Sequence, residues 1–318
     1  MSDNAYKTIL VTGASGVIGG ALRDLQAEYP DRVFIFVTSK DCNLTRYDAV
    51  KRYIAERNPD AIIHLAAVSG GIELSMKQPA TLLRDNLLMN LNIMEAAREL
   101  MVKKVVMTLS SGMYPAEAPN PLREEYMHNG YPHPTTYSYA FAKRLVDPQI
   151  RAYRTEYNLN VIGLIPNAIL GERSNFSYDA ATMVPALIRR FYEHREGVDK
   201  IVVWGDGSPL REITYGKDKA RAFMWCLDNY DQEQVLNVGS TEEVSVKDIA
   251  YMMADILKID RGRIIFDTTK PSGQHRKSTD NSRFTTLSHF SYTPIRGALS
   301  KTVEYFSAHY PDKTKLRL

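Results

Sequence analysis

Tyr139 and Lys143 are the residues of this sequence whose types and spacing most directly suggest chemistry. Side chains four positions apart share one face of a helix, so this spacing places a phenol beside an ammonium group. A phenol has an ordinary pKa of about 10, and a neighbouring positive charge favours its ionised form. We therefore expect the pKa of Tyr139 to be lowered toward the range that suits a proton donor in the hydride reduction of a carbonyl. An amphipathic helix that carries the two residues by chance is the alternative.

Three glycines, Gly13, Gly16 and Gly19, lie between a strand-like run at 7–12 and a helical pattern at 21–27. Strand, glycine turn and helix in this order are typical of a dinucleotide-binding loop. Glycines let the backbone approach a pyrophosphate closely, and the amides at the start of the helix favour its negative charge. The spacing is Gly-x-x-Gly-x-x-Gly, and a turn without a ligand is the alternative.

The end of the second strand, at 33–37, indicates which dinucleotide fits. An acidic residue there would bind the ribose hydroxyls, whereas small or basic residues leave room for a 2′-phosphate. The sequence places Thr38, Ser39 and Lys40 there, and Asp41 follows one position later. This pattern predicts a preference for NADP(H).

Strands and helices alternate along the first half of the chain. The predicted helices cover 46–55 and 80–100, and the predicted strands cover 61–67, 104–109 and 161–165. This alternation predicts an α/β fold with a doubly wound parallel sheet of the Rossmann type. In such a sheet, ligands bind at the carboxyl edge of the strands. Ser110 follows the strand at 104–109 and is therefore well placed to assist Tyr139.

The pattern changes in the second half, which predicts a smaller α/β substrate-binding lobe. Its predicted elements are helices at 183–192, 245–257 and 296–309 and strands at 200–204 and 263–266. Ser245 and Asp248 form a capping box at the start of the middle helix. We place the NADP(H)-binding domain at 1–169 and the substrate lobe at 170–318, although part of the second segment can return to the first domain.

Composition excludes several classes of protein. With 44% hydrophobic and 24% charged residues in 318, the chain has the composition of a soluble globular protein. No apolar run suits a membrane span or a signal peptide, so we expect a cytoplasmic protein. Cys42 and Cys226 are too few for a disulfide framework, no residues have metal-ligand spacing, and His64 suits a core histidine. A net charge of +3 without a basic tract gives no indication of nucleic acid.

These residues together resemble the extended short-chain dehydrogenase/reductase family, and within it the GDP-L-fucose synthase branch of GDP-4-keto-6-deoxymannose 3,5-epimerase/4-reductases. The resemblance extends over nearly the whole chain. Besides the glycine turn, Ser110, Tyr139 and Lys143, it rests on short segments at 37–41, 64–67, 70–71, 128–130, 142–144, 203–205 and 266–270.

The resemblance implies a two-lobed, homodimeric reductase that uses NADPH and binds a GDP-linked 4-keto-6-deoxy sugar. Ser110, Tyr139 and Lys143 would be the catalytic residues, with Tyr139 protonating the C4 oxygen. The residues implied for the coenzyme are Gly13, Ser15, Gly16, Val17, Ile18, Gly19, Ser39, Lys40, Asn43, Leu44, Leu65, Ala66, Ala67, Tyr139, Lys143, Pro166 and Ile169. Those implied for the sugar nucleotide are Ser111, Asn167, Val184, Arg190, Trp204, Arg211 and Lys270.

The sequence departs from the family pattern where epimerisation requires a general base and a general acid. The family carries a cysteine shortly after the catalytic serine and a histidine before the substrate helix, but this chain has Gly112 and Thr182 there. Glycine cannot titrate, and a threonine hydroxyl is a very weak acid and base. The departure favours a dedicated 4-ketoreductase for a hexose or a heptose. A bifunctional epimerase/reductase and a non-catalytic NADP(H) sensor are the alternatives, and the intact Ser110, Tyr139 and Lys143 disfavour the sensor.

Overall fold

The computed structural model describes residues 6–70, 72–179, 181–270 and 275–318 of the chain. Gly71, part of the 70–71 segment considered above, lies outside these ranges. Six parallel strands form the main sheet, in the order β2-β1-β3-β4-β5-β9. Their bounds are β1 (Thr8–Thr12), β2 (Val33–Val37), β3 (Ala61–His64), β4 (Lys104–Thr108), β5 (Val161–Pro166) and β9 (Leu236–Val238). The predicted doubly wound parallel sheet is confirmed.

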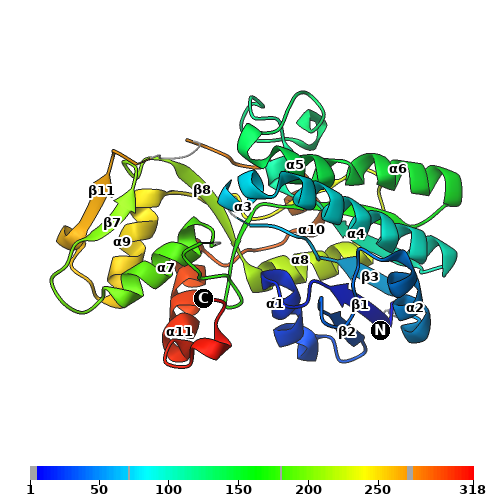
Figure 1. Ribbon diagram of the computed structural model, residues 1–318, viewed down its shortest axis with the longest axis horizontal. Coiled ribbons are helices and arrows are strands. Elements are labelled where there is room, and N and C mark those ends of the chain that lie inside the picture. Colours follow the sequence, from blue (N-terminus) through cyan, green and yellow to red (C-terminus); the bar gives the residue numbers. More distant parts are fainter. Residues whose placement is uncertain (1–5, 71, 180, 271–274) are drawn as a thin grey trace.

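Helices cover both faces of this sheet (Figure 1). They are α1 (Val17–Leu25), α2 (Tyr47–Arg57), α3 (Ile72–Lys77), α4 (Pro79–Glu99), α5 (Tyr137–Arg144), α6 (Val146–Tyr157), α8 (Gly216–Asn229) and α10 (Ser282–Ser288). Successive side chains of a strand point to opposite faces, and β1 follows this rule. Leu10 packs into the core shared with α2, α4 and α6, whereas Ile9 and Val11 pack into the core shared with α1 and α8. A strand buried on both faces explains the continuous apolar run in the sequence.

The rest of the chain forms a smaller α/β part with its own core. It contains a three-stranded sheet and a two-stranded parallel sheet. The strands are β6 (Ala168–Leu170), β8 (Leu210–Tyr215), β10 (Glu243–Ser245), β7 (Ile201–Trp204) and β11 (Ile264–Asp267), and the helices are α7 (Met183–Glu193), α9 (Val246–Leu257) and α11 (Ile295–His309). The capping box of Ser245 and Asp248 at the start of α9 is confirmed.

The second half of the sequence also returns to the main sheet. Helix α8 packs against α1, and β9 pairs with β5 as the last strand of the sheet. Two predicted boundaries differ from the structure. Helix α1 begins at Val17, earlier than predicted, because its first turn contains glycines that hide the helical pattern. Strand β3 ends at His64 because the chain turns there across the carboxyl edge of the sheet.

Within the described ranges, no helix is long and apolar enough to cross a membrane. In the same part of the chain, no three His, Cys, Asp or Glu side chains gather in a way that could hold a metal ion. Cys42 and Cys226 are both buried free thiols.

Candidate active site

Ser110, Tyr139 and Lys143 come together at the carboxyl edge of the main sheet. Ser110 follows β4, and its Oγ accepts a hydrogen bond of 3.1 Å from the backbone N–H of Gly112 at the start of a short 3-10 helix. Tyr139 and Lys143 lie one turn apart on α5, which packs against α4. The serine predicted to assist the tyrosine is hydrogen bonded to it.

Lys143 lies almost completely inside the protein, with 1% of its surface exposed. Its Nζ donates a hydrogen bond of 2.8 Å to the carbonyl oxygen of Thr108, the last residue of β4. Burial disfavours the ammonium form and lowers the pKa of Lys143 to about 8. The group therefore remains mostly protonated at neutral pH.

The predicted direction of the Tyr139 pKa shift was wrong. We expected the ammonium of Lys143 to lower this pKa, but burial of the phenol raises it, and the hydrogen bond with Ser110 opposes the rise only in part. The physical reason is the orientation of the two groups. The Lys143 ammonium is directed to the Thr108 carbonyl, whereas the phenol interacts with Ser110. Tyr139 therefore keeps its proton at neutral pH, as a proton donor must.

The glycine turn between β1 and α1 fits closely against the loop after β3. Gly13 has φ of +68°, and a Cβ there would lie 2.7 Å from the backbone nitrogen of Ala66. A Cβ on Gly19 would lie 2.6 Å from the carbonyl oxygen of Gly13. No side chain caps the N-terminus of α1 at Gly16, so its first amides are open to an anion.

The loop after β2 presents Ser39 and Lys40 to solvent. The carboxylate of Asp41 accepts hydrogen bonds from the backbone N–H of Thr38 at 2.8 Å and from its Oγ1 at 2.6 Å. These bonds lower the pKa of Asp41. The acidic side chain that follows Lys40 is therefore bonded within its own loop.

His64 is a core histidine, as predicted. It is fully buried, and its ring nitrogens contact Thr12 Oγ1 at 2.8 Å and Asn90 Oδ1 at 3.2 Å. Burial lowers its pKa to about 3, so the ring stays neutral. The Thr12 hydroxyl also accepts the N–H of Ala66, which fixes the start of the loop after β3.

The remaining residues assigned to the coenzyme follow the same edge of the sheet. They are Ser15, Val17 and Ile18 in the glycine turn and α1, Asn43 and Leu44 before α2, Leu65 and Ala67 after β3, Pro166 at the end of β5 and Ile169 in β6. The edge therefore collects residues that are far apart in the sequence.

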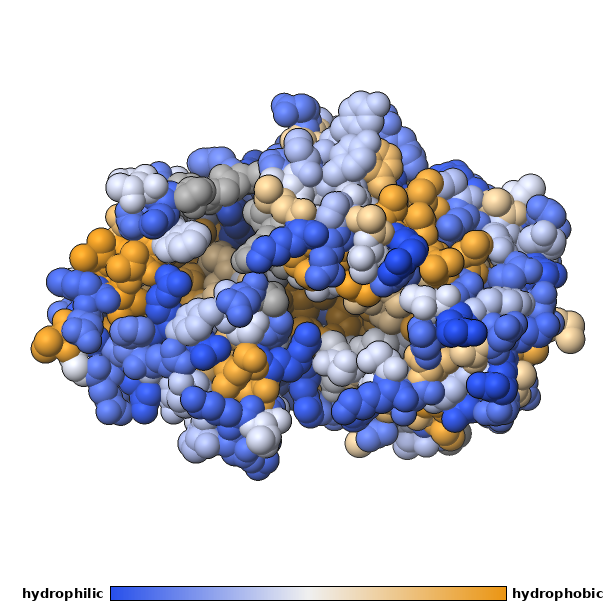
Figure 2. Space-filling view, in the orientation of Figure 1, coloured by the Kyte–Doolittle hydropathy of each residue, from blue (hydrophilic) through white to orange (hydrophobic). Residues whose placement is uncertain are grey.

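The residues assigned to the sugar nucleotide fall into two groups. The first group lies at β7. Trp204 at the end of this strand is 57% exposed, and the ammonium of Lys270 lies 6.0 Å from the centre of its ring. Arg190 Nη1 donates a hydrogen bond of 2.7 Å to the carbonyl oxygen of Val202 on the same strand. The others come from separate segments: Arg211 lies on β8, Asn167 lies between β5 and β6, and Ser111 follows β4. Figure 2 shows that this face of the molecule is hollowed between its two parts.

Two of the assigned residues have their side chains largely occupied inside the protein. Val184 is buried in the core of the smaller part. The side-chain amide of Asn167 is also buried, and its four hydrogen-bonding positions are all used within the protein, by Glu212, Thr214, Lys219 and the carbonyl of Ser240.

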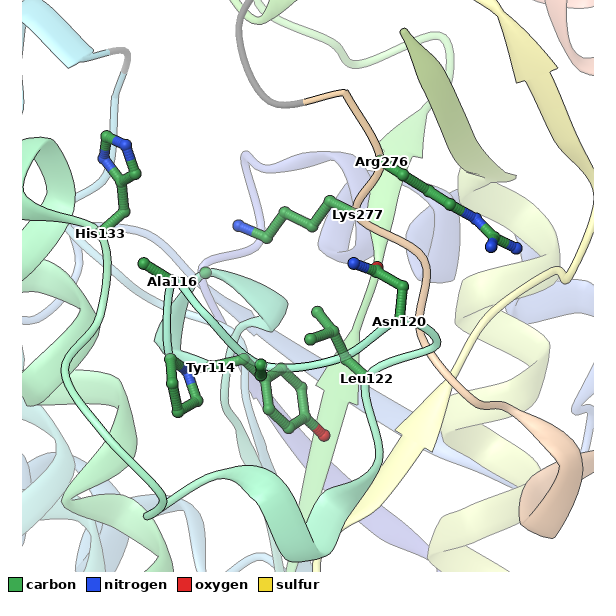
Figure 3. A pocket seen from close by; sticks show the side chains of 10 residues that line it. Tyr114, Ala116, Asn120, Leu122, His133, Arg276 and Lys277 are labelled. Atoms are coloured by element: carbon green, nitrogen blue, oxygen red, sulfur yellow. The ribbon is translucent and has the colours of Figure 1, made fainter.

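A small cavity beside Ser110 is lined by polar residues that were not assigned a site from the sequence. Figure 3 shows the ammonium of Lys277 and the ring of His133 at this cavity. The lining residues are Gly112, Tyr114, Pro115, Ala116, Ala118, Asn120, Leu122, His133, Arg276 and Lys277. Burial and the nearby charge of Arg211 lower the pKa of Lys277. Lys277 has no motif around it, so only the folded chain brings it to the site.

Gly112 and Thr182 stand where the family pattern has its cysteine and its histidine. Gly112 lines the cavity, and a Cβ there would lie 3.3 Å from Ser110 Oγ. Thr182 is the residue before α7, is exposed, and makes no capping hydrogen bond with its side chain.

Residues 9–239 match the NAD dependent epimerase/dehydratase family. The chain belongs to this family. It is 32% identical over 314 residues to the GDP-L-fucose synthase of Dictyostelium discoideum, which covers 97% of this chain and 98% of that protein. It is 33% identical over 307 residues to GDP-L-fucose synthase 1 of Arabidopsis thaliana, covering 96% and 94% of the two chains. The resemblance inferred from the motifs is thereby confirmed.

Among solved structures, the chain is similar to a GDP-L-fucose synthetase from Naegleria fowleri bound to NADP, with 30% identity, a TM-score of 0.92 and full coverage of both chains. A GDP-6-OMe-4-keto-L-xylo-heptose reductase from C. jejuni is 22% identical with a TM-score of 0.87, covers 96% of this chain and 99% of its own, and shares the fold.

Proposed function

We propose that this chain is an NADPH-dependent reductase of the C4 carbonyl in a GDP-linked 4-keto-6-deoxy sugar, either a hexose or a heptose. Family relatives at 32% and 33% identity are GDP-L-fucose synthases, which supports an NADP-dependent oxidoreductase acting on a nucleotide sugar. The observation that carries the proposal is the combination of a protonated Tyr139, hydrogen bonded to Ser110, with Gly112 and Thr182 at the positions where the family carries its epimerisation groups.

The residues of the first domain fit the coenzyme. The turn at Gly13 and Gly19 leaves no room for a Cβ, and the uncapped N-terminus of α1 suits a pyrophosphate. Ser39 and Lys40 would lie beside the 2′-phosphate. When bound, NADPH supplies the hydride for reduction.

The proton chemistry belongs to the protein. Tyr139 donates its phenol proton to the oxygen that becomes an alkoxide at C4, while the hydroxyl of Ser110 orients that oxygen. The phenolate left behind is stabilised by its hydrogen bond with Ser110 and regains a proton from solvent. Burial keeps the phenol protonated before the reaction, so the donor is in its active form at neutral pH.

The diphosphate and the base of the sugar nucleotide have matching groups in the smaller part. Lys277 lines the cavity beside Ser110, and the charge of Arg211 acts on it. Guanidinium and ammonium groups both bind phosphate oxygens. Trp204 offers an exposed aromatic surface for a base or ribose, with Arg190 and Lys270 beside it. Asn167 would contact the sugar nucleotide through its backbone atoms, because its side-chain amide is already hydrogen bonded within the protein. Val184 would contact it through apolar surface.

The direct test is incubation of the protein with GDP-4-keto-6-deoxymannose and NADPH. We expect oxidation of NADPH and a 4-hydroxy product whose configuration at C3 and C5 matches that of the substrate. An epimerised product would favour the bifunctional enzyme, and the absence of NADPH oxidation with 4-keto hexoses and heptoses would contradict the reductase.

Exchange of deuterium tests epimerisation separately. Removing a proton beside a ketone requires a positioned base with a pKa near the working pH, and neither Gly112 nor Thr182 supplies one. We expect no enzyme-dependent deuterium uptake at C3 or C5 in heavy water with NADP⁺, where reduction cannot compete. Uptake at either carbon, measured by NMR, would show that another group acts as the base.

A further inference from the structure

A cluster of six buried polar side chains lies where the chain passes between the main sheet and the smaller part. We call it the junction cluster; its members are Asn167, Glu212, Thr214, Lys219, Ser240 and Thr279, and each is at most 5% exposed. They come from four connecting segments: the link from β5 to β6, the passage from β8 into α8, the link from β9 to β10, and the segment between β11 and α10. One network therefore joins segments that are far apart in the sequence.

Asn167 is the centre of this network. Its Oδ1 accepts hydrogen bonds from Thr214 Oγ1 at 2.7 Å and from Lys219 Nζ at 2.8 Å. Its Nδ2 donates to Glu212 Oε2 at 3.1 Å and to the carbonyl oxygen of Ser240 at 3.0 Å. A fully satisfied buried network of this kind fixes the geometry of the segments that it joins.

Glu212 connects the cluster to the segment that follows β11. Its Oε2 accepts hydrogen bonds from both the backbone N–H and the Oγ1 of Thr279, each at 2.9 Å. The same segment is bound to the start of β8 by the N–H of Leu210, which donates to the carbonyl oxygen of His275 at 2.8 Å. The 275–279 segment is therefore held against β8 at two points, and Glu212 supplies the buried one.

Two positively charged residues, Arg211 and Lys277, lie close in sequence to Glu212 and Thr279. Arg211 precedes Glu212 on β8, and because successive strand residues point to opposite faces, its side chain leaves the cluster. Lys277 lies two residues before Thr279, and its ammonium reaches the cavity at Gly112 (Figure 3). The charge of Arg211 is near enough to lower the pKa of Lys277, and like charges repel.

We propose that Glu212 is a positioning residue of the substrate site: its buried carboxylate fastens the 277–279 segment to β8 and so holds Arg211 and Lys277 together for the diphosphate of the nucleotide sugar. The inference rests on the proposed function, because it takes a GDP-linked substrate as the ligand. Glu212 itself contacts no substrate in this role. Its removal should weaken binding of the diphosphate and leave binding of the coenzyme unchanged.

The test uses the full chain with GDP and NADPH as separate probes, each measured by calorimetry. In Glu212→Gln, whose neutral amide oxygen accepts the hydrogen bonds of Thr279 and Asn167 more weakly than the carboxylate, we expect the Kd for GDP to rise by about tenfold, with the Kd for NADPH changed by less than about threefold. The KM for the 4-keto sugar nucleotide should rise with the Kd for GDP, while kcat changes little. A general loss of structure would weaken both probes together.

Glu243→Gln is the matched control. Glu243 lies opposite Glu212 on β10 and pairs with Arg276 of the same segment, but this ion pair is on the surface. Surface pairs contribute little, so GDP binding should remain at the wild-type level. Equal loss of GDP affinity in both variants would contradict a special role for the buried carboxylate.

Thr279 gives a second test should Glu212→Gln fail to fold. Thr279→Val removes one of the bonds to Glu212 and should weaken GDP binding to a smaller extent, whereas Thr279→Ser keeps the hydroxyl and should restore it. Wild-type GDP affinity in Glu212→Gln or in Thr279→Val would overturn the inference and leave the proposed reductase intact. A wild-type protein that binds no GDP would overturn both the inference and the GDP-linked substrate.

Discussion

At the scale of single residues, burial acts in opposite directions on the two ionisable groups of the site. The charged form of Tyr139 is an anion and that of Lys143 is a cation, so the same desolvation raises the first pKa and lowers the second. Burial therefore strengthens the hold of Tyr139 on its proton and weakens that of Lys143, and both groups remain protonated or mostly protonated at neutral pH. The spacing of the two residues could be predicted from the sequence, but the shifts could not, because they depend on how many protein atoms surround each group.

Substitution of the phenol tests its role as the proton donor. In Tyr139→Phe we expect the rate of carbonyl reduction to fall by about 10²–10⁴-fold, because no other group protonates the C4 oxygen. NADPH binding, followed by fluorescence, should remain nearly unchanged. Tyr137→Phe is the control, since Tyr137 lies on the same helix with its ring exposed. Near-normal turnover in Tyr139→Phe would remove this residue from the mechanism.

The pKa of Lys143 also predicts how stability depends on pH. In the folded chain this pKa is about 8, against an ordinary value of 10.5. Between these two values the unfolded chain binds more protons at this position, so the free energy of unfolding rises with pH. The cost of burying the charge is present in full below pH 8 and absent above 10.5.

Comparison with Lys143→Met isolates this contribution from other groups. The difference in unfolding free energy between wild type and variant, measured by urea denaturation without coenzyme, should shift in favour of the wild type as the pH rises from 8 to 10. A difference that stays constant over this window would show that Lys143 titrates normally in the folded chain.

At the scale of elements, the glycine turn positions the coenzyme edge against the loop after β3. Because a Cβ on Gly13 would contact the backbone of Ala66 at 2.7 Å, and backbone atoms cannot rotate away, a side chain there must displace one of the two loops. The positive φ of Gly13 adds a second cost. The turn therefore requires glycine for both conformation and space.

The steric cost of a Cβ and the conformational cost of a positive φ can be separated by substituting two different glycines. In Gly13→Ala we expect NADPH affinity to fall by at least about tenfold, together with a lower unfolding midpoint. Gly197 also has positive φ, at +97°, but a Cβ there would meet nothing within 4 Å. Gly197→Ala should therefore cost only about 1–2 kcal/mol of stability and leave coenzyme binding intact. Normal NADPH binding by Gly13→Ala would contradict the close approach of the two loops.

Elements with strong apolar periodicity or a capping signal could be predicted, whereas those built around buried polar groups could not. The helices at α4, α9 and α11 and the strands at β1, β2 and β4 agree with the sequence patterns. Strand β8 was not predicted, because Glu212 and Thr214 are polar residues that become buried in the junction cluster. Helix α8 begins at Gly216 and has Lys217 and Asp218 in its first turn, and β9 has only three residues. Their positions depend on partners elsewhere in the chain.

At the scale of the whole molecule, α8 and β9 return to the main sheet, where α8 packs on α1 and β9 adds the last strand next to β5. The segment that supplies them leaves from β8, in the smaller part, and re-enters it at β10. The two parts are therefore joined by several connections and by the junction cluster, which favours a fixed relation between the coenzyme edge and the substrate groups. This connectivity depends on contacts between residues that are far apart in the sequence. It could therefore not be predicted from the pattern of any one segment.

The surface of the main-sheet part also carries an exposed apolar face. Leu88 and Leu91 lie on the same side of α4, and Leu145 lies between α5 and α6, which pack against α4. Each of the three leucines is between 37% and 43% exposed. Figure 2 shows hydrophobic residues gathered over this region. Burial of such a face against a second copy would remove apolar area from water, and we propose that it is the homodimer interface.

This proposal predicts the state of the protein in solution. Wild type should sediment as a dimer at micromolar concentration, and Leu88→Glu combined with Leu91→Glu should sediment as a monomer, because burying two carboxylates in an apolar interface is unfavourable. Leu287→Glu is the control, since Leu287 is a comparably exposed leucine on α10, away from this face. Circular dichroism of the double variant should match that of the wild type. A monomeric wild type, or a double variant that remains dimeric, would place the exposed leucines outside any interface between copies.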